Sequence, residues 1–327
     1  FSYRRACWSR EEPRPHHTRP SIESKFFVRT GLRASCWCKL GPGKRRCLQT
    51  RVSRCTHEYE CELGDLSHLD CDDLAPLVIV SLDIEAVPNT GFPDATHPED
   101  LICSISLVKW VLGRDQEDAE RHAIVAHPGC DPIEGSHVHR CDDERELLVR
   151  TRDLINEMGV DWLLVYNGRF DFPYMNERAL HGPCKLDAFL LCSKLRFHRC
   201  TLTNKRLASG ALGDNVVRFF DMPGRANMDV MMWYKANYKK ASYALNSVCA
   251  EETGETKVDF SYKLIKPYFE GSDAQRRELL VYNVQDCEIM RELCRRLGVY
   301  GDQIELSRVS RVLMERLFSH GQGLKVV

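Results

Sequence analysis

Two acidic residues interrupt an otherwise apolar stretch of this sequence, and their spacing could support metal-dependent chemistry. Leu77 to Glu85 reads LVIVSLDIE, a run that is apolar on both faces and therefore indicates a central β-strand. Asp83 and Glu85 are two residues apart, so a strand places both carboxylates on one face. Adjacent buried carboxylates repel each other, and a bound divalent cation would relieve that cost. On these two residues alone, a pair of solvated carboxylates at a strand end is the simpler interpretation.

A third acidic residue follows a predicted turn. A short strand is expected over Trp162–Tyr166, the turn pair Asn167-Gly168 ends it, and Asp171 lies just before a helix expected over Phe172–Leu180. Taken alone, Asp171 is explained by capping this helix, and Asn167 by an Asx turn.

A fourth acidic residue lies on the helix that the sequence predicts most strongly, Gln275–Leu297. Tyr282 and Asp286 are at positions i and i+4 of this helix and therefore share a face. A surface Tyr and a surface Asp would explain the pair equally well. The helix has an apolar stripe, which predicts that it packs on a core: Leu280, Val284, Cys287, Met290, Cys294 and Leu297.

The elements that must position these residues indicate an α/β or α+β domain, because strands come first and helices later, with some alternation. Further strands are expected at Leu101–Leu112 and Ala123–Ala126, with a hairpin in residues 198–227 that includes a strand at Val216–Phe220. Further helices are expected at Asp142–Met158, Asp187–Arg196, Asp229–Asn237, Ala241–Glu251 and 302–320. Residues 21–75 indicate a small β-containing segment, and residues 1–20, rich in Arg, His and Pro, are expected to be disordered.

Composition excludes several classes of protein. The 327 residues are 43% hydrophobic and 28% charged, which is typical of a globular chain, and no apolar run is long enough to span a membrane. The 16 cysteines contain no C-x-x-C pair, so we expect reduced intracellular thiols instead of a zinc site or a disulfide scaffold. Residues 1–55 contain 14 Lys and Arg against 3 Asp and Glu, and this basic arm could attract nucleic acid or simply be solvated.

Taken together, a D-I-E strand, an N-x-x-F-D turn and a helical Y-x-x-x-D, in this order, resemble the three exonuclease motifs of family B DNA polymerases. The resemblance implies a ribonuclease H-like exonuclease fold, with a mixed β-sheet flanked by helices. It implies that Asp83, Glu85, Asp171 and Asp286 bind two Mg²⁺ or Mn²⁺ ions. Tyr282 would lie beside the attacking water.

The same resemblance extends to most of the chain, about residues 21–327. The segments that carry it include ICSISL at 102–107, GRANMDV at 224–230, ASYALNSV at 241–248 and SHGQGLKVV at 319–327. These resemble delta-type polymerases, although the second motif has two residues between Asn and Phe where the delta pattern has three. We therefore expect residues 21–75 to be part of the polymerase N-terminal region, 76–300 the exonuclease domain, and 301–327 a helix leading toward a polymerase domain. The polymerase motifs are absent and the chain begins with Phe1, so we expect a fragment that does not itself polymerise DNA.

The function expected from this resemblance is 3′→5′ proofreading. The substrate would be the single-stranded 3′ end of primer–template DNA, with Asn167, Phe170 and Phe172 as contacts and Tyr174 as a further aromatic. At least one of these aromatic rings is expected in the core. The rest of the polymerase, a sliding clamp and accessory subunits would be partners, in the nucleus or, for a viral protein, in a viral factory or the cytoplasm. Two alternatives stay open: a catalytically silent nucleic-acid-binding module and a free-standing four-carboxylate nuclease.

Overall fold

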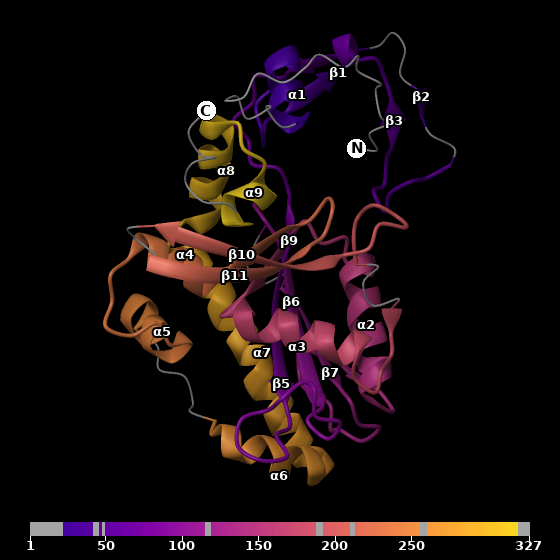
Figure 1. Cartoon of the computed structure of the whole chain (residues 1–327), viewed down its shortest axis with the longest axis vertical. Coiled ribbons are helices and arrows are strands. Elements are labelled where there is room, and N and C mark those ends of the chain that lie inside the picture. Colours follow the sequence, from indigo (N-terminus) through magenta and orange to yellow (C-terminus); the bar gives the residue numbers. More distant parts are fainter. Residues whose placement is uncertain are drawn as a thin grey trace.

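A six-stranded mixed β-sheet lies at the centre of the fold (Figure 1). The computed structural model describes residues 22–41, 46–47, 50–114, 119–187, 192–209, 213–254 and 260–319. In spatial order the strands are β12 (Ala226–Asp229), β9 (Trp162–Val165), β5 (Val78–Ala86), β6 (Ile102–Val111), β7 (Glu120–Val125) and β8 (His137–Arg140). The pairs β12–β9, β9–β5 and β7–β8 are parallel, whereas β5–β6 and β6–β7 are antiparallel. The central strand is β5, as its two-sided apolar pattern predicts.

Helices cover both faces of this sheet. The long helix α7 (Asp273–Arg296) packs on one face, where the Ser81 hydroxyl donates a hydrogen bond of 2.9 Å to the Cys287 carbonyl. The other face is covered by α2 (Glu144–Glu157) and α3 (Gly168–Leu180). On that side Leu82 lines a small apolar cavity together with Ile155 of α2 and Phe172 of α3. A mixed sheet between helices confirms the predicted fold class.

A long antiparallel hairpin extends from the domain (Figure 1). Its strands are β10 (Thr201–Ser209) and β11 (Gly213–Asp221), paired in register along their whole length. This confirms the hairpin predicted in residues 198–227. The rings of Phe172 and Phe220 are 5.2 Å apart, so the base of the hairpin packs on α3.

The N-terminal residues form a small unit beside the C-terminal helices. It contains α1 (Ile22–Thr30) and the short strands β1 (Cys38–Leu40), β2 (Arg46–Cys47), β3 (Tyr59–Glu60) and β4 (Leu66–His68). The strands were expected, and α1 was not. The unit contacts α8 (Val299–Ser310) and α9 (Met314–Ser319) through the hydroxyls of Ser35 and Ser307, 2.8 Å apart, and through an ion pair of Glu23 with Arg316 at 3.1 Å.

Three predicted helices need correction. The helix expected at Asp187–Arg196 is wrong over residues 192–196, because this backbone pairs with residues 52–54: Arg54 N–H donates to Lys194 O at 2.7 Å and Arg196 N–H to Val52 O at 2.8 Å. The single helix expected at 302–320 is two, because Arg311 adopts a left-handed conformation with φ 55° between α8 and α9. The helix expected at Ala241–Glu251 begins later, as α5 (Leu245–Thr253).

The remaining helices and strands either lie close to their predicted ranges or were not predicted. Helix α3 begins four residues before the expected Phe172, and β7 begins three residues before Ala123. Helix α4 (Val230–Asn237) matches its prediction within one residue, while α6 (Ile265–Glu270), β8 and β12 were not anticipated. Short 3-10 helices occur at Leu63–Asp65 and Tyr262–Leu264.

Three further expectations concern disorder, the cysteines and membrane-spanning segments. The disorder expected for residues 1–20 lies outside the described residues. Fourteen of the cysteines in the described ranges are free thiols, most of them buried, and burial raises the pKa of Cys130 to about 11. Within the same described ranges, no helix has both the length and the apolar character to cross a membrane.

Candidate active site

The carboxyl end of β5 presents two acidic side chains to one face of the sheet. Asp83 and Glu85 alternate with buried Leu82 and Ile84, which point to the opposite face. Asp83 pairs with Ser106 of β6 and Glu85 with Ser104, so polar side chains of two strands share the face. A shift of register after Glu85 ends the regular pairing there. The predicted placement of both carboxylates on one face is therefore correct.

Helix α7 brings a third carboxylate to the same face. Asp286 is only 7% exposed and lies on the turn of α7 that packs on β5 and β6, beside Cys287. The thiol of Cys287 donates to the Ser106 carbonyl at 3.3 Å, and its own carbonyl accepts from Ser81. These two bonds fix the register of the helix against the sheet, and thus the height of Asp286 above β5.

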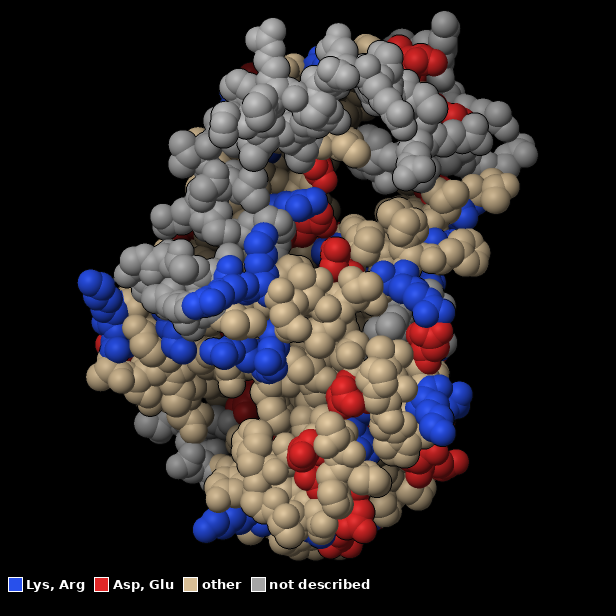
Figure 2. Space-filling view, viewed as in Figure 1, with Lys and Arg blue, Asp and Glu red and all other residues tan. Residues whose placement is uncertain are grey.

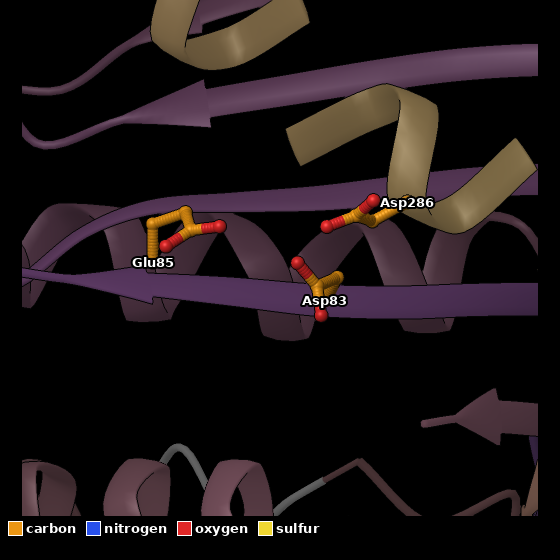
Figure 3. Close-up of side chains that lie close together, drawn as sticks. All are labelled: Asp83, Glu85 and Asp286. Atoms are coloured by element: carbon orange, nitrogen blue, oxygen red, sulfur yellow. The ribbon is translucent and has the colours of Figure 1, made fainter. Parts of the chain in front are cut away.

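Asp83, Glu85 and Asp286 converge on a single point. One oxygen from each lies within 4.8 Å of the other two. Figure 3 shows the carboxyl groups of Asp83 and Asp286 pointing toward each other, with that of Glu85 approaching from the strand end. Three ionised carboxylates this close repel strongly unless a cation lies between them. Hard oxygen ligands of this kind are suited to Mg²⁺ or Mn²⁺.

Asp171 lies next to this cluster, in the first turns of α3, and is 4% exposed. Burial raises its pKa well above the ordinary value, and the negative charge of Asp83 raises that pKa further. The structure thus brings Asp171 into electrostatic contact with Asp83. Its oxygens are not among the three that converge, and it is a residue of the helix and not its cap.

Tyr282 is one turn before Asp286 on α7, as the i, i+4 spacing predicts. Burial raises the pKa of its hydroxyl, and the nearby charge of Asp286 raises that pKa further. The phenol therefore keeps its proton and can donate a hydrogen bond. The ring of Phe260 lies 4.8 Å from that of Tyr282 and helps to hold it in place, a contact that the sequence did not reveal.

A carboxylate on β12 fixes the turn that leads into α3. Asp229 accepts hydrogen bonds from the backbone N–H groups of Asn167 at 3.1 Å and Gly168 at 3.0 Å, and it also caps α4. Burial raises the pKa of Asp229 to about 6 although these bonds oppose the shift. Gly168 is required because a Cβ there would lie 2.6 Å from the Val165 side chain. Asn167 is exposed and adopts a left-handed backbone conformation with φ 63°, which forms the turn into α3.

The aromatic residues predicted to contact DNA occupy different environments. Phe172 is 2% exposed and packs on Phe220, so its ring belongs to the core, where a base does not reach it. Tyr174 is also buried and donates its hydroxyl proton to the Asp100 carbonyl at 2.7 Å. Phe170 is half-buried on the first turn of α3 and is the one ring of these three on an accessible surface.

A further aromatic ring, not anticipated from the sequence, lies beside Phe170. Phe92 belongs to the loop between β5 and β6, is 76% exposed, and contacts Phe170 edge to face with ring centroids 5.4 Å apart. The signal in the sequence was a Phe in a loop that contains three Pro and one Gly, seven residues after Glu85. An exposed aromatic ring that packs on Phe170, the neighbour of Asp171 in the sequence, is suited to stacking on a nucleobase.

Comparison with known proteins is consistent with this geometry. The model of the family described as "DNA polymerase family B, exonuclease domain" matches residues 18–248, which include Asp83, Glu85 and Asp171. The chain is 30% identical over 309 residues to the DNA polymerase delta catalytic subunit of Glycine max, covering 93% of this chain and 28% of that protein. It is 31% identical over 321 residues to the delta catalytic subunit of Bos taurus, and the match covers 96% of this chain and 28% of that protein. The DNA polymerase catalytic subunit of Equine herpesvirus 2 is 29% identical over 272 residues, and the match covers 82% of this chain and 26% of that protein.

The chain thus spans a little over a quarter of the length of these relatives. The family match covers more than two thirds of it, and the described sheet, flanking helices and carboxylate cluster fit a ribonuclease H-like exonuclease. This chain belongs to the exonuclease domain family of the family B DNA polymerases.

Proposed function

We propose that this chain is the 3′→5′ proofreading exonuclease domain of a replicative, delta-type DNA polymerase. The observation that carries the proposal is the convergence of Asp83, Glu85 and Asp286, whose oxygens lie within 4.8 Å of one another. The family match and the delta catalytic subunits among the relatives support it. Residues 21–75 would be part of the polymerase N-terminal region, 76–300 the exonuclease, and 301–327 the connection toward the polymerase domain.

Asp83, Glu85, Asp171 and Asp286 would hold two Mg²⁺ or Mn²⁺ ions. The donor set fits, because all four are carboxylates, three of them converge, and the fourth is in electrostatic contact with Asp83. When bound, such ions stabilise negative charge on the phosphate and make water a stronger nucleophile at neutral pH. Without them, the mutual repulsion of the carboxylates would also exclude a phosphodiester.

The protein groups around the cluster would bind and orient the reactants. The protonated Tyr282 hydroxyl would donate a hydrogen bond to the attacking water, with its ring held against Phe260. Phe92 and Phe170 would stack on the terminal bases of a single-stranded 3′ end. Hydrolysis would release one 5′-nucleoside monophosphate at a time.

Selection of mismatched ends follows from the single-stranded substrate, because a mispaired terminus costs less free energy to unpair. The β10–β11 hairpin would help to separate the strands. Figure 2 shows Lys and Arg side chains gathered in the region of this hairpin, where they would attract the phosphate backbone of primer–template DNA.

In the cell, the domain would act with the rest of its polymerase, a sliding clamp and accessory subunits. The delta relatives favour the nucleus, and the herpesvirus relatives leave a viral compartment as the alternative. These assignments rest on the longer relatives.

The proposal is tested by incubating the chain with 5′-labelled single-stranded DNA, in Mg²⁺ and in EDTA. We expect a metal-dependent ladder that shortens from the 3′ end. Asp83→Asn should lower the rate roughly 100-fold or more, because the charge stabilisation lost is worth several kcal/mol. Asp302→Asn, at an exposed position on α8, is the matched control and should behave as wild type.

Other outcomes favour the alternatives. A folded chain that binds Mn²⁺ and DNA but produces no ladder would be a silent binding module. Degradation of RNA as fast as DNA would favour a free-standing four-carboxylate nuclease.

A further inference from the structure

A buried amide lies directly behind the carboxylate cluster. Asn283, between Tyr282 and Val284 on α7, is 0% exposed. Its side-chain NH₂ donates a hydrogen bond of 2.6 Å to Oδ2 of Asp83, and its Oδ1 is 3.1 Å from the Ser104 hydroxyl. One side chain therefore links α7 to both β5 and β6 at the height of the cluster.

The orientation of this amide is determined by its partners. An ionised carboxylate only accepts hydrogen bonds, so the NH₂ group must face Asp83. The amide oxygen must then face Ser104, whose hydroxyl donates. A rotated amide would place its oxygen against the carboxylate and lose both bonds, which is costly for buried groups.

The bond to Asn283 fixes how Asp83 is presented. It holds Oδ2 toward α7 and so sets the rotation of the carboxylate, and with it the direction of Oδ1. It also offsets part of the negative charge of Asp83 without adding a positive charge that would compete with a cation. The attachment of α7 does not depend on it, because Ser81 and Cys287 bond the helix to the sheet independently and its apolar face is buried.

We propose that Asn283 is a positioning residue that orients Asp83 for the divalent cation and is itself oriented by Ser104. This inference rests on the proposed function, since it assumes that the cluster binds a metal. Groups that orient metal ligands typically change metal affinity or activity 10–100-fold when they are removed. A role confined to stability would leave metal affinity unchanged.

The test measures Mn²⁺ binding to the full chain without DNA, by the electron paramagnetic resonance of the free ion, together with thermal unfolding. We expect Asn283→Ala to weaken Mn²⁺ binding about 10- to 100-fold and Ser104→Ala to weaken it by a smaller factor. Hydrolysis by both variants should recover as Mn²⁺ is raised, with the KM for DNA unchanged. Asn227→Ala is the control, because Asn227 is a buried amide on β12 that donates to the Phe220 carbonyl at 2.6 Å. It should lower the unfolding temperature and leave Mn²⁺ binding as in wild type.

The outcomes separate this inference from the proposed function. Wild-type affinity in Asn283→Ala, with only a lower unfolding temperature, overturns the positioning role. If that variant does not fold, Ser104→Ala decides, and unchanged Mn²⁺ affinity in Ser104→Ala overturns the positioning role of the Ser104–Asn283 pair. If Asn283→Ala weakens Mn²⁺ binding but the wild-type chain hydrolyses no DNA, the positioning role of Asn283 is supported and the proposed nuclease function is refuted. A wild-type chain that binds no Mn²⁺ overturns both.

Discussion

The buried ion pair between Arg178 and Glu144 leads to the sharpest stability prediction. The guanidinium of Arg178, on α3, is 0% exposed and donates to the two carboxylate oxygens of Glu144, on α2, at 2.8 and 2.6 Å. It also donates to the backbone carbonyls of residues 95, 97 and 98, at distances between 2.7 and 3.3 Å. Since residues 95–98 belong to the loop that carries Phe92, this pair anchors the loop beside the candidate site.

We expect Arg178→Met to cost about 3–5 kcal/mol of unfolding free energy. The methionine fills much of the volume but leaves the carboxylate of Glu144 buried without its counter-charge, and breaking one side of a buried pair has this typical cost. The loss is a large part of the roughly 5–15 kcal/mol that stabilises a domain. The double variant Arg178→Met/Glu144→Leu removes both charges and should recover part of it. Its residual cost is about 1–3 kcal/mol, because the Ile102 N–H, which donates to Glu144 at 2.8 Å, loses its buried acceptor and the loop carbonyls lose their Arg178 donor.

The assay is urea unfolding of wild type, the two single variants and the double variant, followed by nuclease kinetics at a temperature where all are folded. In Arg178→Met the KM for single-stranded DNA should rise more than kcat falls, because the loop bearing Phe92 loses its anchor while the carboxylates lie on β5 and α7. A cost below about 1 kcal/mol, or a double variant less stable than the sum of the singles, would refute the reasoning.

Three further predictions follow from single positions. Phe92→Ala should weaken single-stranded DNA binding by about 1–3 kcal/mol, measured as KM, and leave the unfolding temperature unchanged because the ring is 76% exposed; Phe92→Trp should retain affinity. Gly168→Ala should lower stability by about 1–3 kcal/mol in urea unfolding, since its Cβ would lie 2.6 Å from Val165. Burial lowers the pKa of His139 from 6.5 to about 4, so the unfolded chain binds a proton at this side chain more readily than the folded chain. The free energy of unfolding is therefore highest above pH 6.5 and falls as the pH falls toward 4. The full difference in pKa would correspond to about 3.4 kcal/mol, and solvent screening at this partly exposed side chain reduces the contribution. His139→Gln should flatten that part of the stability curve.

The relative placement of Asp83 and Glu85, and of Tyr282 and Asp286, was predictable because two short periodicities set it, whereas no periodicity places Asp171. Alternation along a strand sets Asp83 and Glu85 on one face, and the i, i+4 spacing sets Tyr282 and Asp286 on one side of a helix. The apolar stripe of that helix indicated burial, and the sheet face it covers is the one with the acids. What the sequence lacked was the register of helix against sheet, which depends on contacts such as that of Ser81 with the Cys287 carbonyl, 206 residues apart.

The errors arose where backbone groups found partners distant in sequence. The run Asp187–Arg196 was expected to be helical, but the Lys194 carbonyl accepts from Arg54 N–H and the Arg196 N–H donates to the Val52 carbonyl. Phe172 and Phe170 are two residues apart and equally aromatic, so only the position of α3 under the hairpin decides that the first is core and the second is accessible. Phe92 was missed because a loop has no periodicity from which its direction can be derived.

Asn283, the proposed positioning residue, could not be recognised as part of the site from the sequence. In the sequence it is the uncharged neighbour of Tyr282, and its helical position predicts only that it faces the sheet. Its significance depends on the amide reaching Asp83 and Ser104 together, which requires β5, β6 and α7 to be in register at once. The carboxylate cluster was expected from the resemblance of three ordered motifs to the family B exonucleases, because each acidic residue alone had a simpler structural explanation. The group that orients one of those acids has no such distinctive chemistry, so only the assembled structure points to it, and metal affinity is the property that should change when it is removed.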